Sequence, residues 1–208
     1  MKALLIFAVV CGMANPTDRY VESMTRQIAT LYQANSPELL QTSVNAFDRI
    51  AQVESQHWEP LYYSAFGNIM LAIRETSAAR KDQYLDLALA SVQKAQALQP
   101  ANGEITAMEG FVYMIRVTVD PGARGQQYSA MAFGAINKAL AMSPGNPRAL
   151  GLLAQMELGT ARFFNASTAG ACETARKALA QYDSFQPENE LTPMWGREMT
   201  EEVLKNCH

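Results

Sequence analysis

A helical pattern recurs four times at an interval of about 44 residues, and it limits what this chain can fold into. In each copy, small or apolar side chains follow one another at steps of four, four, three and three residues, which keeps one face of an α-helix apolar over four turns. The copies begin at Leu39, Tyr84, Tyr128 and Ala171. A helix stop follows each copy after two residues, at Ser55, Pro100, Pro144 and Pro187. So regular an interval predicts an array of similar helical units.

The segments between these copies also have the features of helices. Three of them begin beside a Pro or Asn, residues that favour a helix start, and cover residues 58–74, 104–118 and 146–164. A first helix from Thr17 to about Tyr32 and a last helix opened by Pro193 complete the set. No segment alternates apolar and polar residues as a half-buried strand does. The predicted fold class is therefore all-α, built from αα-hairpins.

The second helix of each expected pair resembles the second helix of tetratricopeptide (TPR) repeats. Two small residues seven positions apart, Ala88 and Ala95, are followed by Pro100 five positions later. The same spacing recurs at residues 132, 139 and 144. Small residues stand ten positions after Ser55, Pro100 and Pro144, where the family packs two helices closely: Ala65, Gly110 and Ala154. The matching copy after Pro187 has Arg197 instead, which indicates a capping helix.

The resemblance covers about residues 36–205 and implies a right-handed αα-hairpin solenoid with three to four repeats plus capping helices. The unit is longer than the roughly 34 residues of a TPR, and a unit of this length also suits HEAT-like repeats. We expect the extra length near the hairpin turns, at residues 76–81, 118–125 and 165–170.

In TPR arrays the first helix of each pair lines an inner groove, and the resemblance implies an aromatic- and Met-rich groove here. A partner protein or peptide would bind there by apolar burial. Alternatively, the chain fills the groove itself, with its first helix or with the C-terminal residues around Trp195. The implied groove residues are Tyr62, Tyr63, Phe66, Met70, Met108, Phe111, Ile115, Leu152 and Gln155.

Residues 1–14 resemble a secretory signal peptide, with Lys2, a short apolar run and a small-x-small cleavage site ending at Ala14. An anchor acylated at Cys11 and a buried N-terminal strand are the alternatives. The apolar run is shorter than the roughly 20 residues that span a bilayer, so we expect no integral membrane span. Residues 15–208 are then one exported helical-repeat domain, periplasmic or associated with the cell envelope.

Export would place Cys172 and Cys207 in a compartment that permits disulfides. Both lie in expected helices on either side of a turn at residues 186–190, and they are equally far from its centre. Because such residues face each other in an antiparallel helix pair, we predict a disulfide; two free thiols are the alternative.

Composition and residue types argue against several function classes. The 17 basic and 20 acidic residues leave no basic excess for nucleic acid. The two histidines stand at a repeat junction, His57, and at residue 208, so we expect no catalytic residues, no metal site and no cofactor. The leading hypothesis is a non-enzymatic adaptor that binds a protein partner in the groove. The alternative is a soluble carrier of a small apolar ligand in a closed helical cavity.

Overall fold

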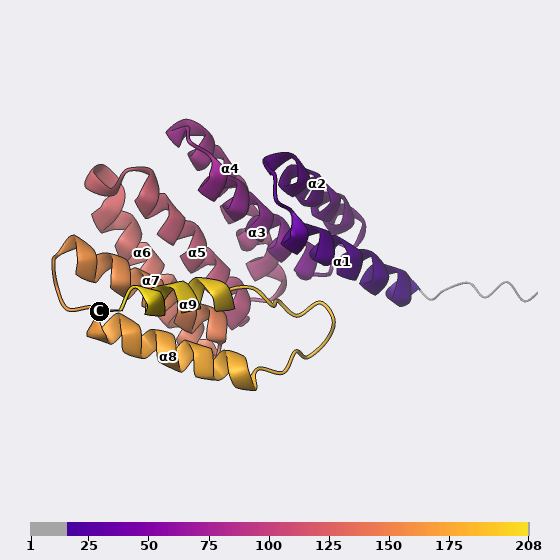
Figure 1. Ribbon diagram of the computed structural model, residues 1–208. Coiled ribbons are helices and arrows are strands. Elements are labelled where there is room, and N and C mark those ends of the chain that lie inside the picture. Colours follow the sequence, from indigo (N-terminus) through magenta and orange to yellow (C-terminus); the bar gives the residue numbers. More distant parts are fainter. Residues whose placement is uncertain (1–15, 208) are drawn as a thin grey trace, which may run out of the picture.

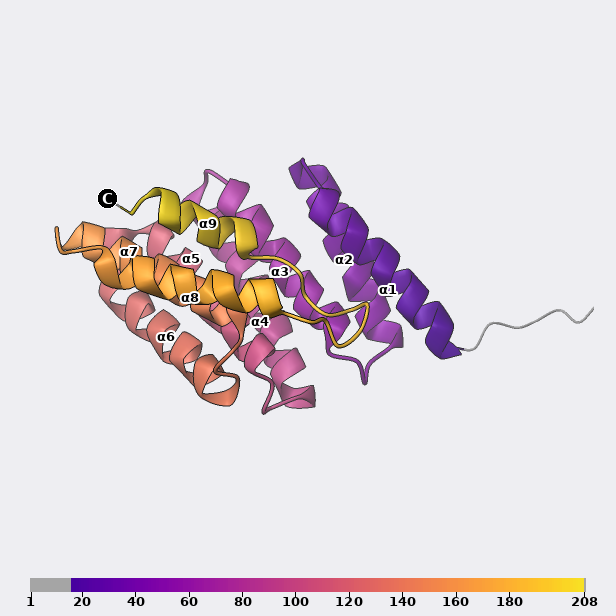
Figure 2. The same cartoon turned by 60° about the horizontal axis from the view of Figure 1, so that its bottom comes forward.

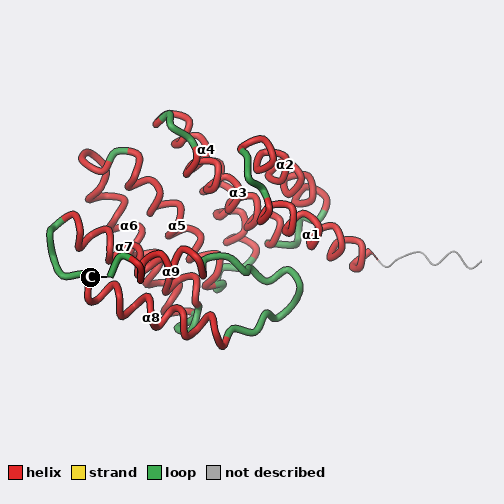
Figure 3. Tube along the Cα trace, in the orientation of Figure 1, coloured by secondary structure: helices red, strands yellow, loops and turns green. Residues whose placement is uncertain are grey.

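The computed structural model describes residues 16–207, and within that range every regular element is an α-helix (Figures 1 and 3). The expected signal segment, residues 1–14, lies outside the described residues. The helices are α1 (Pro16–Gln33), α2 (Pro37–Val53), α3 (Glu59–Arg74), α4 (Ala78–Leu98), α5 (Gly103–Val119), α6 (Pro121–Met142), α7 (Pro147–Phe163), α8 (Ala169–Ser184) and α9 (Arg197–Lys205).

The helices form two layers of a solenoid. Helix α5 contacts α3 on one side and α7 on the other, and α1 and α9 extend this inner layer at its two ends. Helices α2, α4, α6 and α8 form the outer layer, each packed against the inner helices that precede or follow it in the chain. Figure 1 shows the hairpins following one another from α1 and α2 to α7 and α8. The predicted all-α hairpin solenoid is confirmed, and none of the described helices has the length and apolarity needed to cross a bilayer.

Side-chain caps fix where the inner helices α5 and α7 begin. The Oδ1 atom of Asn102 accepts hydrogen bonds from the backbone N–H groups of Glu104 and Ile105, at 2.9 and 3.2 Å. Asn146 caps α7 in the same way through the N–H of Ala149 at 2.9 Å. Each cap satisfies backbone donors that a helix start leaves without partners, so these junctions are set by local sequence.

The three small residues in register, Ala65, Gly110 and Ala154, lie where helices approach closely. Ala65 and Ala154 are fully buried. A Cβ atom added at Gly110 would lie 2.6 Å from Cγ1 of Ile136 and 3.3 Å from the Ile136 backbone nitrogen. Helices α5 and α6 therefore pack at a distance that leaves no room for a side chain at Gly110.

The extra length of the repeat unit is helical rather than looped in two of three places. Helix α4 begins at Ala78 and α6 at Pro121, well before the apolar pattern of each copy starts. The turns that precede them are correspondingly short, and only residues 164–168 form a longer connection. The extra length lies near the hairpin turns, as expected, and in the first two units it extends the outer helices into solvent rather than lengthening the turns.

The prediction that Pro193 opens the last helix is wrong. Residues 185–196, here called the strap, have no regular structure, and α9 begins only at Arg197. Gly196 adopts φ +102°, a left-handed conformation that glycine tolerates and that breaks any helix running through it. Figure 2 shows the strap reaching from α8 toward α1 and α3 before it returns to α9.

A disulfide joins Cys172 in α8 to Cys207, just beyond α9, as the sequence predicts. It fixes the far end of α9 to α8. Both ends of the strap are therefore attached to the same body: one continues from α8, and the other leads into a helix held by the disulfide.

Candidate functional site

The strap covers the inner groove that the TPR resemblance implies, whose nine residues lie on α3, α5 and α7. Two of its nine implied residues, Met70 and Gln155, are partly exposed. Leu191 and Trp195 of the strap are buried against its floor, with 5% and 7% of their surface exposed. The groove is filled by the chain itself, through its C-terminal residues. The buried groove residues are Tyr62, Tyr63, Phe66, Met108, Phe111, Ile115 and Leu152.

Trp195 stacks on two aromatic rings of the groove. Its ring centroid is 5.1 Å from that of Phe66 on α3 and 5.3 Å from that of Phe111 on α5, with interplanar angles of 30° and 21°. These separations correspond to offset stacking. The indole N–H donates a 2.9 Å hydrogen bond to the hydroxyl of Tyr62, and the Trp195 carbonyl accepts one from Tyr182 at 3.2 Å. The space that the Trp195 indole fills against Phe66 and Phe111 is here called the slot.

A buried ion pair lies beside this slot. Oε1 of Glu104 accepts hydrogen bonds from the Tyr62 hydroxyl at 2.6 Å and from Nε of Arg148 at 2.7 Å, while Oε2 accepts one from Asn146 at 2.7 Å. Only 3% of Arg148 is exposed. Burial alone would lower the pKa of Arg148, but the Glu104 carboxylate outweighs it and raises that pKa, so the guanidinium stays charged.

The Arg148 guanidinium has a buried nitrogen whose N–H groups are left over. Its Nη1 atom is buried and has no hydrogen-bond partner among the described residues. On another side the guanidinium stacks over the ring of Phe185, the first residue of the strap, with its central carbon 4.5 Å from the ring centroid. A charged donor without a partner is costly when buried, so this is a place where an anion would be stabilised.

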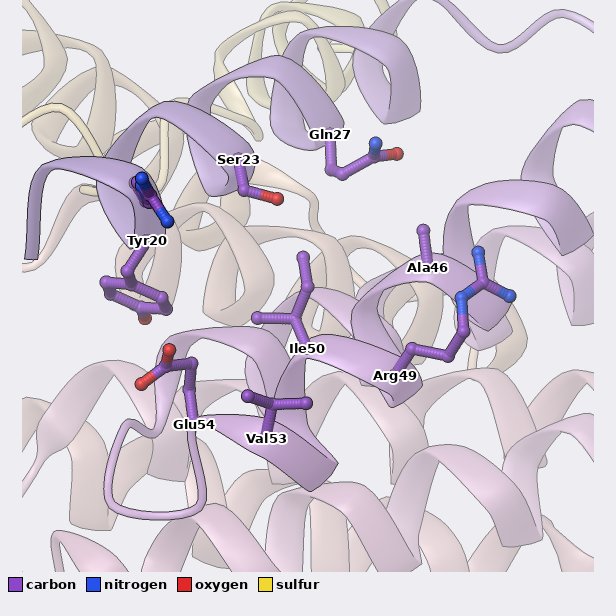
Figure 4. A pocket seen from close by; sticks show the side chains of 9 residues that line it. Tyr20, Ser23, Gln27, Ala46, Arg49, Ile50, Val53 and Glu54 are labelled. Carbon is purple, nitrogen blue, oxygen red and sulfur yellow. The ribbon is translucent and has the colours of Figure 1, made fainter. Parts of the chain in front are cut away.

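A second, open pocket lies between α1 and α2, and nothing in the sequence pattern pointed to it. Its volume is about 360 Å³. Ala46, Ile50 and Val53 form its apolar wall, and Figure 4 shows Ile50 and Val53 between Tyr20 on one side and Arg49 on the other. The remaining lining side chains are polar: Arg19, Ser23, Gln27 and Glu54.

The cations of this open pocket are accessible to a ligand. Within residues 16–207, neither Arg19 nor Arg49 has a carboxylate oxygen within 4.0 Å. Both side chains are exposed. The ring of Tyr20 lies 4.2 Å from that of His57, and the Tyr20 hydroxyl donates to Glu59 at 3.3 Å. The pocket combines an apolar wall, an aromatic edge and two guanidinium groups.

The buried tyrosines make the fold sensitive to alkali. Burial raises the pKa of Tyr62, Tyr63 and Tyr182 above the ordinary value of 10, and burial together with Glu59 raises that of Tyr20. Above pH 10 the unfolded chain loses these protons while the folded chain keeps them, so the free energy of unfolding falls as pH rises. We expect melting temperatures that are steady between pH 8 and 9.5 and fall progressively from pH 10 upward. Thermal melts followed by circular dichroism measure this, and a melting temperature that stays constant to pH 11.5 would contradict it.

No cluster of three or more His, Cys, Asp or Glu side chains that suits a metal ion occurs in the described part of the chain. His57, at the junction before α3, has the aromatic contact with Tyr20 and lies 3.9 Å from the Glu59 carboxylate. The site is thus defined by apolar surface, aromatic rings and guanidinium groups.

Comparison with solved structures gives two likenesses. The HusA haemophore from Porphyromonas gingivalis aligns with a TM-score of 0.82 and 29% identity, over 93% of this chain and 94% of its own. TTC0263, a TPR protein from Thermus thermophilus, aligns with a TM-score of 0.53 and 17% identity, over 91% and 92% of the two chains. No protein-family model and no curated protein matches. The repeated hairpins and these two likenesses identify the chain as a TPR-like helical-repeat protein.

Proposed function

We propose that this protein is a non-enzymatic carrier of a flat, largely apolar ligand that bears carboxylates, of the haem type. The observation that carries the proposal is the likeness to a haemophore over almost the full length of both chains, at 29% identity and a TM-score of 0.82. A non-enzymatic binding role also fits the TPR protein found by the same comparison. The proposal develops the carrier alternative of the sequence analysis.

The open pocket between α1 and α2 supports this ligand class. A porphyrin has an apolar face that suits Ala46, Ile50 and Val53, and its carboxylates suit the guanidinium groups of Arg19 and Arg49. The pocket volume of about 360 Å³ lies at the lower end of the roughly 300–1,000 Å³ typical of ligand sites. A porphyrin would therefore be held on one face and along its acidic edge, with the rest of the ring exposed.

Titration with haemin, followed by visible absorption, tests the proposal. We expect saturable binding to the wild-type protein. Replacing both pocket cations, Arg19→Gln with Arg49→Gln, should weaken binding about tenfold, equivalent to about 1.4 kcal/mol, because two charge-assisted hydrogen bonds are lost. Arg176→Gln, an exposed arginine on α8, is the matched control and should leave the affinity unchanged.

The titration tests the carrier function and the location of its binding site separately. Absence of saturable binding by the wild-type protein would overturn the carrier function. Equal affinities for the wild type and the Arg19→Gln/Arg49→Gln variant would retain the function and reject the pocket as its site.

Export to the periplasm or cell envelope belongs to the same proposal. The Cys172–Cys207 disulfide supports it, since such bonds persist mainly in oxidising compartments. The expected signal segment, residues 1–14, would direct export, and residues 15–208 would form the mature domain. Cell fractionation tests this: recovery of the chain in the envelope or periplasmic fraction with Ala14 removed supports it, and recovery of full-length chain in the cytosol contradicts it.

A protein partner in the inner groove is the second candidate function. Its specific support is that an extended peptide segment, the strap, already lies in this groove with Leu191 and Trp195 as anchors. A partner peptide would use similar anchors and would have to displace the strap. A synthetic peptide of residues 185–196 that binds a strap-deleted chain would support this function, and no binding at millimolar peptide would count against it.

A further inference from the structure

Three features of the covered groove describe a binding site rather than ordinary core. The slot is lined by two aromatic rings, since Phe66 and Phe111 both stack on the flat Trp195 indole, with centroid distances of 5.1 and 5.3 Å. A fully charged guanidinium lies beside the slot with a buried Nη1 donor that has no partner among the described residues. The cover is an irregular segment with no helix of its own, residues 185–196.

We propose that the strap is a displaceable cover, and that the groove beneath it is a second site for a flat aromatic carboxylic acid. The ligand ring takes the place of the Trp195 indole against Phe66 and Phe111, and a ligand carboxylate accepts a hydrogen bond from Nη1 of Arg148. The choice of a porphyrin as the probe ligand depends on the proposed function; the slot and the unpartnered guanidinium do not.

Besides the two hydrogen bonds of Trp195 and one from Thr25 to Glu190, two further hydrogen bonds hold the strap. The Tyr63 hydroxyl donates to the Leu191 carbonyl at 2.8 Å, and the Met194 N–H donates to the Tyr32 hydroxyl at 3.2 Å. Residues 186–190 are exposed and make little contact with the groove. The main apolar anchors are Leu191 and Trp195.

The ends of the strap stay in place when its centre lifts. Helix α8 precedes it, and α9 after it is tied back to α8 by the Cys172–Cys207 disulfide. Gly196, at φ +102°, is the joint between strap and α9. The strap can therefore open as a loop fixed at both ends while α7, α8 and α9 keep their packing.

Lifting the strap also prepares the anion site. Phe185, at the fixed α8 end of the strap, stays stacked on the Arg148 guanidinium, so it is the lifting of the strap's centre that gives a ligand access to Nη1. Glu104 holds Nε of Arg148 at 2.7 Å and thereby fixes the direction of the remaining donors. The Tyr62 hydroxyl, which now accepts from the Trp195 indole, becomes available to a polar atom at the ligand edge.

Loosening the strap should tighten ligand binding, because wild-type binding includes the free energy of displacing the strap. We expect Trp195→Ala to bind iron-free protoporphyrin about tenfold more tightly than wild type. Tyr63→Phe removes only the hydrogen bond to Leu191 and keeps the aromatic lining, and it should tighten binding about threefold. The matched control is Tyr113→Phe, which removes a 3.0 Å hydrogen bond to Glu109 away from the strap and should change nothing.

The dimethyl ester of the same porphyrin tests the carboxylate contact with Arg148. This measurement uses a chain carrying Trp195→Ala with Arg19→Gln and Arg49→Gln, so that the open pocket responds little to ligand charge. We expect the ester to bind about tenfold more weakly than the free acid. Equal affinities of ester and acid would overturn the role of Arg148.

Hydrogen exchange gives a readout that needs no substitution. Adding protoporphyrin to the wild-type protein should speed the exchange of the backbone amides of Leu191, Thr192, Met194 and Trp195, since the strap leaves the groove. Unchanged or slower exchange in this segment would overturn the proposal. If wild type, Trp195→Ala and Tyr63→Phe bind with one affinity, the strap is not displaced, whereas the carrier function stands. If only Trp195→Ala binds, the covered site is supported, whereas the open pocket is rejected and the carrier function of the wild-type protein is overturned.

Discussion

Glu104→Gln should cost the protein about 3 kcal/mol of unfolding free energy. The change leaves the Arg148 guanidinium, 3% exposed, without its counter-charge, and removing one partner of a buried ion pair typically costs about 3–5 kcal/mol. We place the loss at the lower end because glutamine keeps the shape and one acceptor for Tyr62. Urea unfolding followed by circular dichroism gives the value.

An exposed pair provides the control for this measurement. Glu202→Gln makes the same chemical change next to Lys205, where both side chains are more than half exposed, and should leave the urea midpoint unchanged. A loss at Glu104 no larger than that at Glu202 would show that the Glu104–Arg148 pair contributes nothing specific to the fold.

Removing the Cys172–Cys207 disulfide should have an effect of similar size, about 4 kcal/mol. The bond closes a loop with a sequence separation of 35 residues, and its loss restores conformational freedom to the unfolded chain. The variant Cys172→Ala with Cys207→Ala should unfold at a lower urea concentration than wild type. Wild type in reductant should match it.

Reductant is also the control. The double variant should be insensitive to reductant, because residues 16–207 then contain no cysteine. An equal unfolding free energy for oxidised wild type and the double variant would contradict the stabilising role of the disulfide.

The solenoid itself was predictable because its information is local and repeated. The four apolar copies give the outer helices, and Asn102 and Asn146 mark where inner helices start. The close contact at Gly110 follows from the TPR register. The disulfide also followed, since equal distances from one turn bring Cys172 and Cys207 together.

The strap was not predictable from local pattern. Pro193 and the residues after it have the signals of a helix start, and these signals favour α9 beginning three or four residues early. Burial of Trp195 against Phe66 and Phe111, far away in the sequence, outweighs this preference and requires the left-handed turn at Gly196.

The two proposed ligand sites could not be predicted from the apolar periodicity of the sequence, because they depend on contacts between distant residues. The apolar pattern of α2 predicts which side of the helix packs against its neighbours, but not how much of that side α1 covers. The exposure of Val53 beside Ile50, which forms the wall of the open pocket, was therefore missed. The Glu104–Arg148 pair did leave a trace, because the two residues are 44 apart and hold equivalent positions in successive units. Comparing equivalent positions across units would have found it.

Native mass spectrometry of the folded protein mixed with haemin tests the carrier function most directly. The control is the TPR protein TTC0263, which shares the fold at 17% identity. We expect this chain to form a complex with intact haemin, and we expect this complex to survive gel filtration. We expect no such complex for the control. Two results would contradict the proposed function. One is that this chain carries no haemin after gel filtration, and the other is that both proteins retain haemin equally.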